Sequence, residues 1–263
     1  SPQDREARRW LVERLRETGH EARIDGIASV VGRAPGTGPK LLAGSHLESQ
    51  NHAGWLDGAL GVIYALEAAR AAAEDPEMAA AGAGVDVIAF ADEEGHFGHF
   101  HGSRSFTGKL SEADIDAARN RTDGRALRAA LAEAGLADAP RAAFEPGRCR
   151  AFMEAHIEQG DRLDGSGLQV GVVTSIVAIW QYRVVATGEQ NHAGTTSMAR
   201  RRDAGAALVR LLGRIETEFP EVAGPASVWT AGRMAFEPGA PSIIPGRAEM
   251  LFQFRDADRA TLD

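Results

Sequence analysis

Five side chains of the types that bind metal ions share one kind of position in the chain. Each ends or follows an apolar run, or begins a long helical stretch; they are His46, Asp57, Glu93, Glu94 and His156. Ligands bind at the carboxyl ends of strands in open α/β sheets, and imidazole and carboxylate groups are ordinary ligands of Zn²⁺. The set therefore indicates a divalent-metal site at a sheet edge. One aspartate there can give an oxygen to each of two ions, a pair suited to polarising a carbonyl and activating water.

The adjacent residues Glu93 and Glu94 could have two different roles. Neighbouring residues in an extended segment point to opposite sides, so one carboxylate can hold a metal ion while the other faces the attacking water. Either glutamate alone is more simply a solvated loop residue, and only the full set of five favours a metal site.

Apolar runs and helical periodicity alternate along the first part of the chain. Strands are predicted at 21–25, 29–32, 40–43, 85–90 and 151–156, and helices at 4–18, 57–73, 111–119 and 123–135. The helix at 57–73 has its larger apolar residues on one side and alanines elsewhere; the larger residues are Leu60, Ile63, Tyr64 and Leu66. Strands that alternate with helices predict an α/β fold with a mostly parallel sheet. A loop rich in Gly, Phe and His is expected from residue 95 to residue 108.

The pattern changes near residue 178. Strands are predicted at 179–188, 227–236 and 248–255, with a helix at 203–218 and a further helix start at the end. This order predicts a smaller α+β domain with an antiparallel sheet and two helices. We assign residues 1–178 to a metal-binding catalytic domain and 179–263 to the second domain. Because the last residues are typical of a helix that stops after about two turns, we expect the chain to be part of a longer protein.

Composition excludes several classes of function. The chain has 263 residues, 44% of them hydrophobic, and a net charge of −8. This charge disfavours binding to nucleic acid or to an anionic membrane surface, and no apolar run reaches the roughly 18–20 residues needed to cross a bilayer. Cys149 is the single cysteine, so no disulfide forms within the chain and a reducing, cytoplasmic location is expected.

Seven motifs stand in an order that resembles the amidase branch of the M20 metallopeptidase family. They are Gly-Ser-His-Leu at 44–47, Leu-Asp-Gly-Ala-Leu-Gly-Val at 56–62, Asp-Glu-Glu-Gly at 92–95, Gly-Ser-Arg at 102–104, His-Ile-Glu-Gln-Gly at 156–160, Asn-His-Ala-Gly-Thr-Thr at 191–196 and Glu-Pro-Gly-Ala-Pro at 237–241. That branch includes N-carbamoyl-L-amino-acid hydrolases, allantoate amidohydrolases and β-ureidopropionase-like enzymes. The resemblance covers essentially the whole chain.

The resemblance implies a role for each of the five ligand-type side chains. It places His46, Asp57 and His156 around one Zn²⁺ or Mn²⁺ ion, with Asp57 bridging to a second ion that Glu94 also holds. It makes Glu93 the general base that deprotonates the attacking water and later protonates the leaving nitrogen. Two divalent ions per subunit are therefore expected, and the family's last histidine ligand would lie beyond residue 263.

The resemblance also makes the second domain a lid and a dimerisation module. His192 would stabilise the oxyanion, often across a homodimer, because an imidazole can donate a hydrogen bond to developing negative charge. Gln159 and Arg255 would bind the substrate, and the planar guanidinium of Arg255 would hold a carboxylate. An arginine at a strand end is otherwise usually a surface charge. A small carboxylate-bearing substrate is the expected partner.

Departures from the family pattern lie around the substrate. Glu48 stands where relatives usually have an aspartate that orients the first histidine ligand, and the extra methylene would shift this support. His96 and Ser242 stand where relatives carry arginine and asparagine, and both are expected to contact substrate. His96, His99 and His101 are alternatively additional ligands, although a hydrogen-bonding or pocket-wall role is favoured because the family site is already full.

The expected activity is hydrolysis of a linear, non-peptide C–N bond in an N-carbamoyl, ureido or N-acyl amino acid. One alternative is an M20 dipeptidase or aminoacylase, which the His-Ile-Glu-Gln-Gly motif disfavours. The other is a non-catalytic dimeric relative that binds a metabolite, which the intact acidic residues disfavour.

Overall fold

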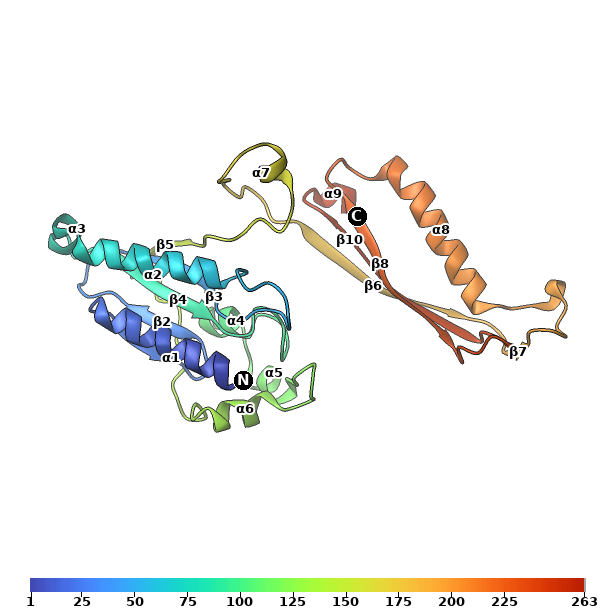
Figure 1. Cartoon of the computed structure of the whole chain (residues 1–263), viewed down its shortest axis with the longest axis horizontal. Helices are drawn as coiled ribbons and strands as arrows, with labels where there is room; N and C mark the ends of the chain where they lie inside the picture. The colour runs from blue at the N-terminus through green and yellow to red at the C-terminus, as the bar shows by residue number, and fades with distance from the viewer. Residues whose placement is uncertain (263) are drawn as a thin grey trace. The chain divides into compact units, whose positions relative to one another are not determined.

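The computed structural model describes residues 1–262, which fold as two compact units, one of residues 1–165 and one that begins at Ser166 (Figure 1). Each unit has its own sheet and its own hydrophobic core. None of the helices in the described part of the chain is long and apolar enough to span a membrane.

The first unit is built on a mixed sheet with the strand order β1-β2-β4-β3-β5. Its strands are β1 (Glu21–Ile24), β2 (Val30–Arg33), β3 (Lys40–His46), β4 (Gly84–Phe90) and β5 (Cys149–Met153). The strands β4, β3 and β5 are parallel, whereas β1 with β2 and β2 with β4 pair antiparallel. The prediction of a mostly parallel sheet is therefore wrong for one half of it. The five residues between β1 and β2 form a tight turn around Asp25, whose carboxylate accepts the backbone N–H groups of Ile27 and Ser29, and so short a connection permits only antiparallel pairing.

Seven helices belong to the first unit: α1 (Pro2–Glu17), α2 (Ala59–Glu74), α3 (Pro76–Ala80), α4 (His101–Phe106), α5 (Glu112–Ala117), α6 (Leu127–Glu133) and α7 (Arg162–Gly165). Helix α1 begins at Pro2 after the cap Ser1, whose hydroxyl accepts the N–H of Asp4 at 3.2 Å. Helix α4 lies inside the segment that was expected to be a loop, and its buried residues include His101.

Helix α2 packs on the sheet mainly with small residues, together with Val62 and Leu66. Tyr64 is 55% exposed and Ile63 is 36% exposed, whereas Val62, Ala65 and Ala69 are buried. A Cβ on Gly61 would lie 2.2 Å from the carbonyl oxygen of Ala155, so only a small-residue face allows this close approach. Of the four larger apolar residues predicted to share one side, Leu66 is buried, whereas Ile63 and Tyr64 are exposed.

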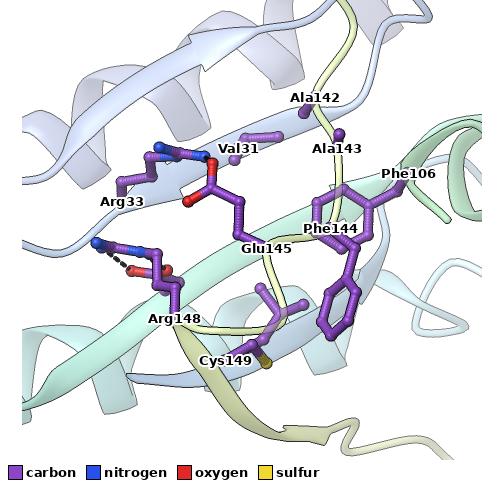
Figure 2. Close-up of a pocket in the computed structure, with 11 residues that line it drawn as sticks. Val31, Arg33, Phe106, Ala142, Ala143, Phe144, Glu145, Arg148 and Cys149 are labelled. Carbon is purple, nitrogen blue, oxygen red and sulfur yellow. Dashed lines mark hydrogen bonds and ion pairs between the residues drawn. The ribbon is translucent and has the colours of Figure 1, made fainter. Parts of the chain in front are cut away.

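The two faces of the first sheet are covered differently. Helices α1 and α2 pack on one face through a core that includes Leu11, Leu15, Val62 and Leu66. The other face carries a small cluster that includes Ile88 and a cavity of about 30 Å³, shown in Figure 2 with Phe106, Phe144 and Arg148 among its lining residues.

The second unit contains an antiparallel sheet with the order β6-β10-β8. Its elements are β6 (Ala178–Thr187), β7 (Asn191–His192), the 3-10 helix η1 (Met198–Arg200), α8 (Ala204–Val222), β8 (Val228–Glu237), β9 (Ile243–Ile244), β10 (Arg247–Asp256) and α9 (Arg259–Leu262). Helix α8 covers one face of the sheet, where Leu208 packs with Ala248, Met250 and Phe252. β7 and β9 form a separate two-stranded ribbon that carries His192.

Candidate metal centre

The three parallel strands bring the predicted ligands to one edge of the first sheet. β3 ends at His46, Glu93 and Glu94 follow β4, and His156 follows β5. β3 lies between β4 and β5, so His46 can take part in a cluster on either side. Two groups of ligand atoms form there, each lying within 4.8 Å: His46 with Asp57 and His156, and His46 with Glu93 and Glu94.

In the first group, the side chains converge on one carboxylate oxygen. The Nε2 atom of His156 lies 2.8 Å from Asp57 Oδ1, and the Nε2 atom of His46 lies 3.8 Å from it. Within the described part of the chain this buried oxygen accepts no hydrogen bond. A buried carboxylate oxygen without a hydrogen-bond partner is energetically unfavourable. A divalent cation bound by the three ligand atoms would offset this cost.

The tautomers of the two histidines fit the same role. His46 Nδ1 lies 2.8 Å from the backbone carbonyl oxygen of Glu48, and His156 Nδ1 lies 2.9 Å from that of Ile157. A carbonyl oxygen only accepts, so Nδ1 carries a proton in each ring, and in the neutral ring Nε2 presents a lone pair toward Asp57. Metal-ligating histidines usually donate their other ring nitrogen in this way.

The second group places two carboxylates beside His46. Glu93 Oε2 lies 3.5 Å from His46 Nε2, and the Glu94 carboxylate accepts the side-chain amide of Gln50 at 2.5 Å. Burial raises the pKa of Glu93, His46 opposes the rise, and the neighbouring carboxylates of Glu94, Glu48 and Asp57 add to it. This glutamate is therefore held nearer to the range in which a carboxylate exchanges protons with substrate and water.

The segment that carries Glu93 and Glu94 is bent rather than extended, so the predicted alternation of their side chains does not apply. Asp92 has a left-handed backbone with φ of 59°, and its carboxylate accepts bonds from the Phe97 N–H at 2.9 Å and from His101 Nδ1 at 2.5 Å. Both Asp92 and His101 are buried. His101 therefore supports the bend.

Gly58 allows Asp57 to approach His46. It caps α2 with φ of 73°, and a Cβ at this position would lie 2.3 Å from Nδ1 of the His46 ring. Any larger residue would meet the ring, so the Asp-Gly pair ahead of α2 is required by the packing of the cluster itself.

Comparison with known proteins finds similar hydrolases and amidases. The model of peptidase family M28 matches residues 27–123. An N-carbamoyl-L-amino acid amidohydrolase of Geobacillus stearothermophilus is 34% identical over 97% of this chain and 62% of its own length. An allantoate amidohydrolase of Bacillus subtilis is 33% identical over 93% of this chain and 60% of its own length. The crystal structure of an amidase of the hydantoinase/carbamoylase family from Burkholderia phymatum has a TM-score of 0.89 and 48% identity, covering 100% of this chain and 64% of that chain.

The relatives of this chain are thus N-carbamoyl-L-amino acid and allantoate amidohydrolases, and its structural neighbours are amidases of the hydantoinase/carbamoylase family. The amidase branch indicated by the seven motifs is thereby confirmed, and the hydrolase domain is of the M28/M20 type. The chain spans 60–64% of the length of these three relatives.

Glu48 does not have its expected role at this site. Its carboxylate was expected to orient His46, but the backbone carbonyl of Glu48 does so. The longer side chain carries the carboxylate to Arg8 of α1 and to the backbone N–H of Glu93. Sequence reasoning missed Arg8 and also Gln50; the available signal for Arg8 was a charged residue on the same helix face as Leu11 and Leu15.

Two further predicted residues lie in the first unit. Gln159 donates its side-chain amide to Asp57 Oδ2, and His96 Nε2 donates to the carbonyl oxygen of Ser49 at 2.9 Å. Neither metal-ligand group found in the described residues includes His96, His99 or His101. The hydrogen-bonding interpretation of His96 and His101 is therefore favoured over additional metal ligation.

The remaining predicted residues lie in the second unit. His192 Nδ1 accepts the N–H of Gly194 at 3.0 Å, and the backbone oxygen of Ser242 accepts the N–H of Ala193 at 2.8 Å. The guanidinium of Arg255 lies 3.4 Å from the side-chain oxygen of Gln253. The roles of His192, Ser242 and Arg255 in catalysis stay predictions.

Proposed function

We propose that the protein is a metal-dependent amidohydrolase that cleaves a linear, non-peptide C–N bond of an N-carbamoyl, ureido or N-acyl amino acid. The observation that carries this proposal is the pair of ligand groups sharing His46, with the orphaned oxygen of Asp57 at the centre of one. The activities named for the relatives, N-carbamoyl-L-amino acid and allantoate hydrolysis, support the substrate class.

The residues present fit one divalent cation, Zn²⁺ or Mn²⁺, and would supply part of the ligand set of a second. His46, Asp57 and His156 would hold one ion, and Glu94, which lies in the second group around His46, would help to hold the other. Bound cations would supply Lewis acidity toward the substrate carbonyl and toward water.

Glu93 would act as the general base and then the general acid in this reaction. Its carboxylate lies beside His46 at the sheet edge, and its raised pKa suits a group that first accepts a proton from water and then returns it to the leaving nitrogen. Gln159 and His96, which lie in the same unit, would help to hold the substrate.

The second unit would act as a lid and as a homodimer interface. Because a backbone N–H donates to Nδ1 of His192, the neutral ring carries its proton on Nε2 and can donate it to an oxyanion. The backbone oxygen of Ser242 accepts the N–H of Ala193, the residue after His192. Arg255 on β10 offers a planar fork for a substrate carboxylate. Cys149 is a free thiol, which favours a cytoplasmic location.

The test is hydrolysis by the purified protein after loading with Zn²⁺ or Mn²⁺. The panel contains N-carbamoyl, ureido and N-acyl amino acids together with dipeptides, and ammonia and free amine are measured. We expect cleavage of at least one carbamoyl or ureido compound, abolished by a chelator and restored by metal. Cleavage of dipeptides alone would instead support the second candidate, a peptidase, which the M28 match favours. Absence of bound metal would contradict both.

A further inference from the structure

Arg8 is a buried charge on the inner face of α1. It is 3% exposed, on the same helix face as Leu11 and Leu15. Its Nε donates to the Asp4 carboxylate at 3.0 and 3.1 Å, and its Nη1 donates to the carbonyl oxygen of Ala28 at 2.6 Å. Burial opposes its charge, but Asp4 and Glu48 raise the pKa of Arg8 above its ordinary value. A charge is retained in such a place only when it is paired.

Glu48 connects the remaining donor of Arg8 to the candidate metal centre. Arg8 Nη2 donates to Glu48 Oε2 at 3.0 Å, and the other carboxylate oxygen of Glu48 accepts the Glu93 N–H at 2.5 Å. The backbone carbonyl of the same glutamate accepts His46 Nδ1 at 2.8 Å. The Glu48 side chain is 8% exposed, so these contacts are shielded from water.

We propose that Arg8 and Glu48 are positioning residues that fix Glu93 relative to His46. Neither of them contributes an atom to the two ligand groups found in the described residues, so they act through the residues that they hold. Arg8 fixes the rotamer of Glu48, and the Glu48 carboxylate fixes the backbone of Glu93 just after the left-handed turn at Asp92. The part of this inference that concerns catalysis rests on the proposed function.

The expected size of the effect follows from geometry. Without the Glu48 carboxylate, the Glu93 N–H loses its acceptor and the bend is free to shift. Misplacing a catalytic group by about 1 Å costs about a hundredfold in rate, and loss of residues that support metal ligands costs about ten- to a hundredfold in affinity or activity.

The test compares three variants with a matched control. Glu48→Ala removes the acceptor, and Arg8→Met leaves the Glu48 carboxylate without its counter-charge. Adding Glu48→Gln to Arg8→Met removes that buried charge and keeps an oxygen for the Glu93 N–H. The control is Arg148→Met, because Arg148 likewise bridges a carboxylate, Asp86, and a backbone carbonyl, but on the face shown in Figure 2.

Two readouts separate this inference from the proposed function. The first is amide hydrogen exchange of the Glu93 N–H in the metal-free protein, which we expect to be at least tenfold faster in Glu48→Ala and unchanged in Arg148→Met. The second is steady-state kinetics on the substrate found by the panel. We expect kcat to fall ten- to a hundredfold in Glu48→Ala and Arg8→Met with little change in KM, and to recover partly in Arg8→Met/Glu48→Gln.

Unchanged exchange at Glu93 in Glu48→Ala would overturn the inference, whether or not the protein is active. Equal kcat in Arg8→Met and Arg148→Met, per folded molecule, would also overturn it. If no compound is hydrolysed while the exchange rate responds as expected, the proposed function fails and the structural tie between Glu48 and Glu93 is upheld.

Discussion

Substitution of Gly58 by alanine tests the packing of the metal centre without touching a ligand. The new Cβ would lie 2.3 Å from Nδ1 and Cε1 of His46, whereas ordinary contacts begin at 3.4 Å. Either the ring or the segment that carries Asp57 must therefore move by about 1 Å, a displacement that costs about a hundredfold in rate at a catalytic group. Alanine at a φ of +73° adds backbone strain of about 1–2 kcal/mol.

We expect Gly58→Ala to lose about 2–5 kcal/mol of unfolding free energy, from strain and overpacking together. Affinity for Zn²⁺ should fall at least tenfold, because the His46–Asp57 geometry is disturbed. Gly124→Ala is the matched control: Gly124 has the same φ of +73°, but nothing lies within 4 Å of its added Cβ. It should lose only about 1–2 kcal/mol and leave metal affinity unchanged.

The assays are urea unfolding and zinc titration of the purified variants, followed by hydrolysis of the best substrate. If Gly58→Ala binds zinc as tightly as the unsubstituted protein and keeps its kcat within about threefold, His46 and Asp57 are not held by this contact. The reasoning from steric exclusion would then be refuted.

Two other outcomes follow from hydrogen bonds in the first unit. His101→Ala leaves the buried carboxylate of Asp92 without one partner, so the free energy of unfolding should fall by about 1–3 kcal/mol in urea titrations; an unchanged value would contradict this. The pKa of Asp114 is lowered from 3.8 to about 2 by bonds from Ser111 and by Arg104, so its contribution to stability is present above pH 3.8 and is lost as pH falls through about 2. Asp114→Asn should therefore flatten the pH dependence of unfolding in that interval, and an unaltered slope would count against it.

Most of the candidate ligands could be found from the sequence because parallel strands end at a common edge. His46, Glu93 and His156 follow three strands that the structure shows to be parallel neighbours. What the sequence did not contain was the strand order. Only the central place of β3 explains why His46 belongs to both groups of ligand atoms.

Other features depended on contacts between distant segments. The face of α2 that packs is rich in alanine, so hydrophobicity placed the buried Leu66 on the same side as Ile63 and Tyr64, which are exposed. Arg8 was visible as a charge on an apolar helix face, but its partner Glu48 lies 40 residues away in a loop. The bend at Asp92 arises from bonds to Phe97 and His101, which no local pattern specified.

The central claim is that bound metal and the Glu93 carboxylate act together in hydrolysis. The most direct test is Glu93→Gln, for which bound Zn²⁺ and hydrolysis of the best carbamoyl or ureido substrate are measured on the same sample. We predict metal content close to that of the unsubstituted protein and a kcat lower by about 10²–10⁴-fold, the usual contribution of a general acid–base group. Unchanged hydrolysis by Glu93→Gln, or an unsubstituted protein that binds no metal, would contradict the account.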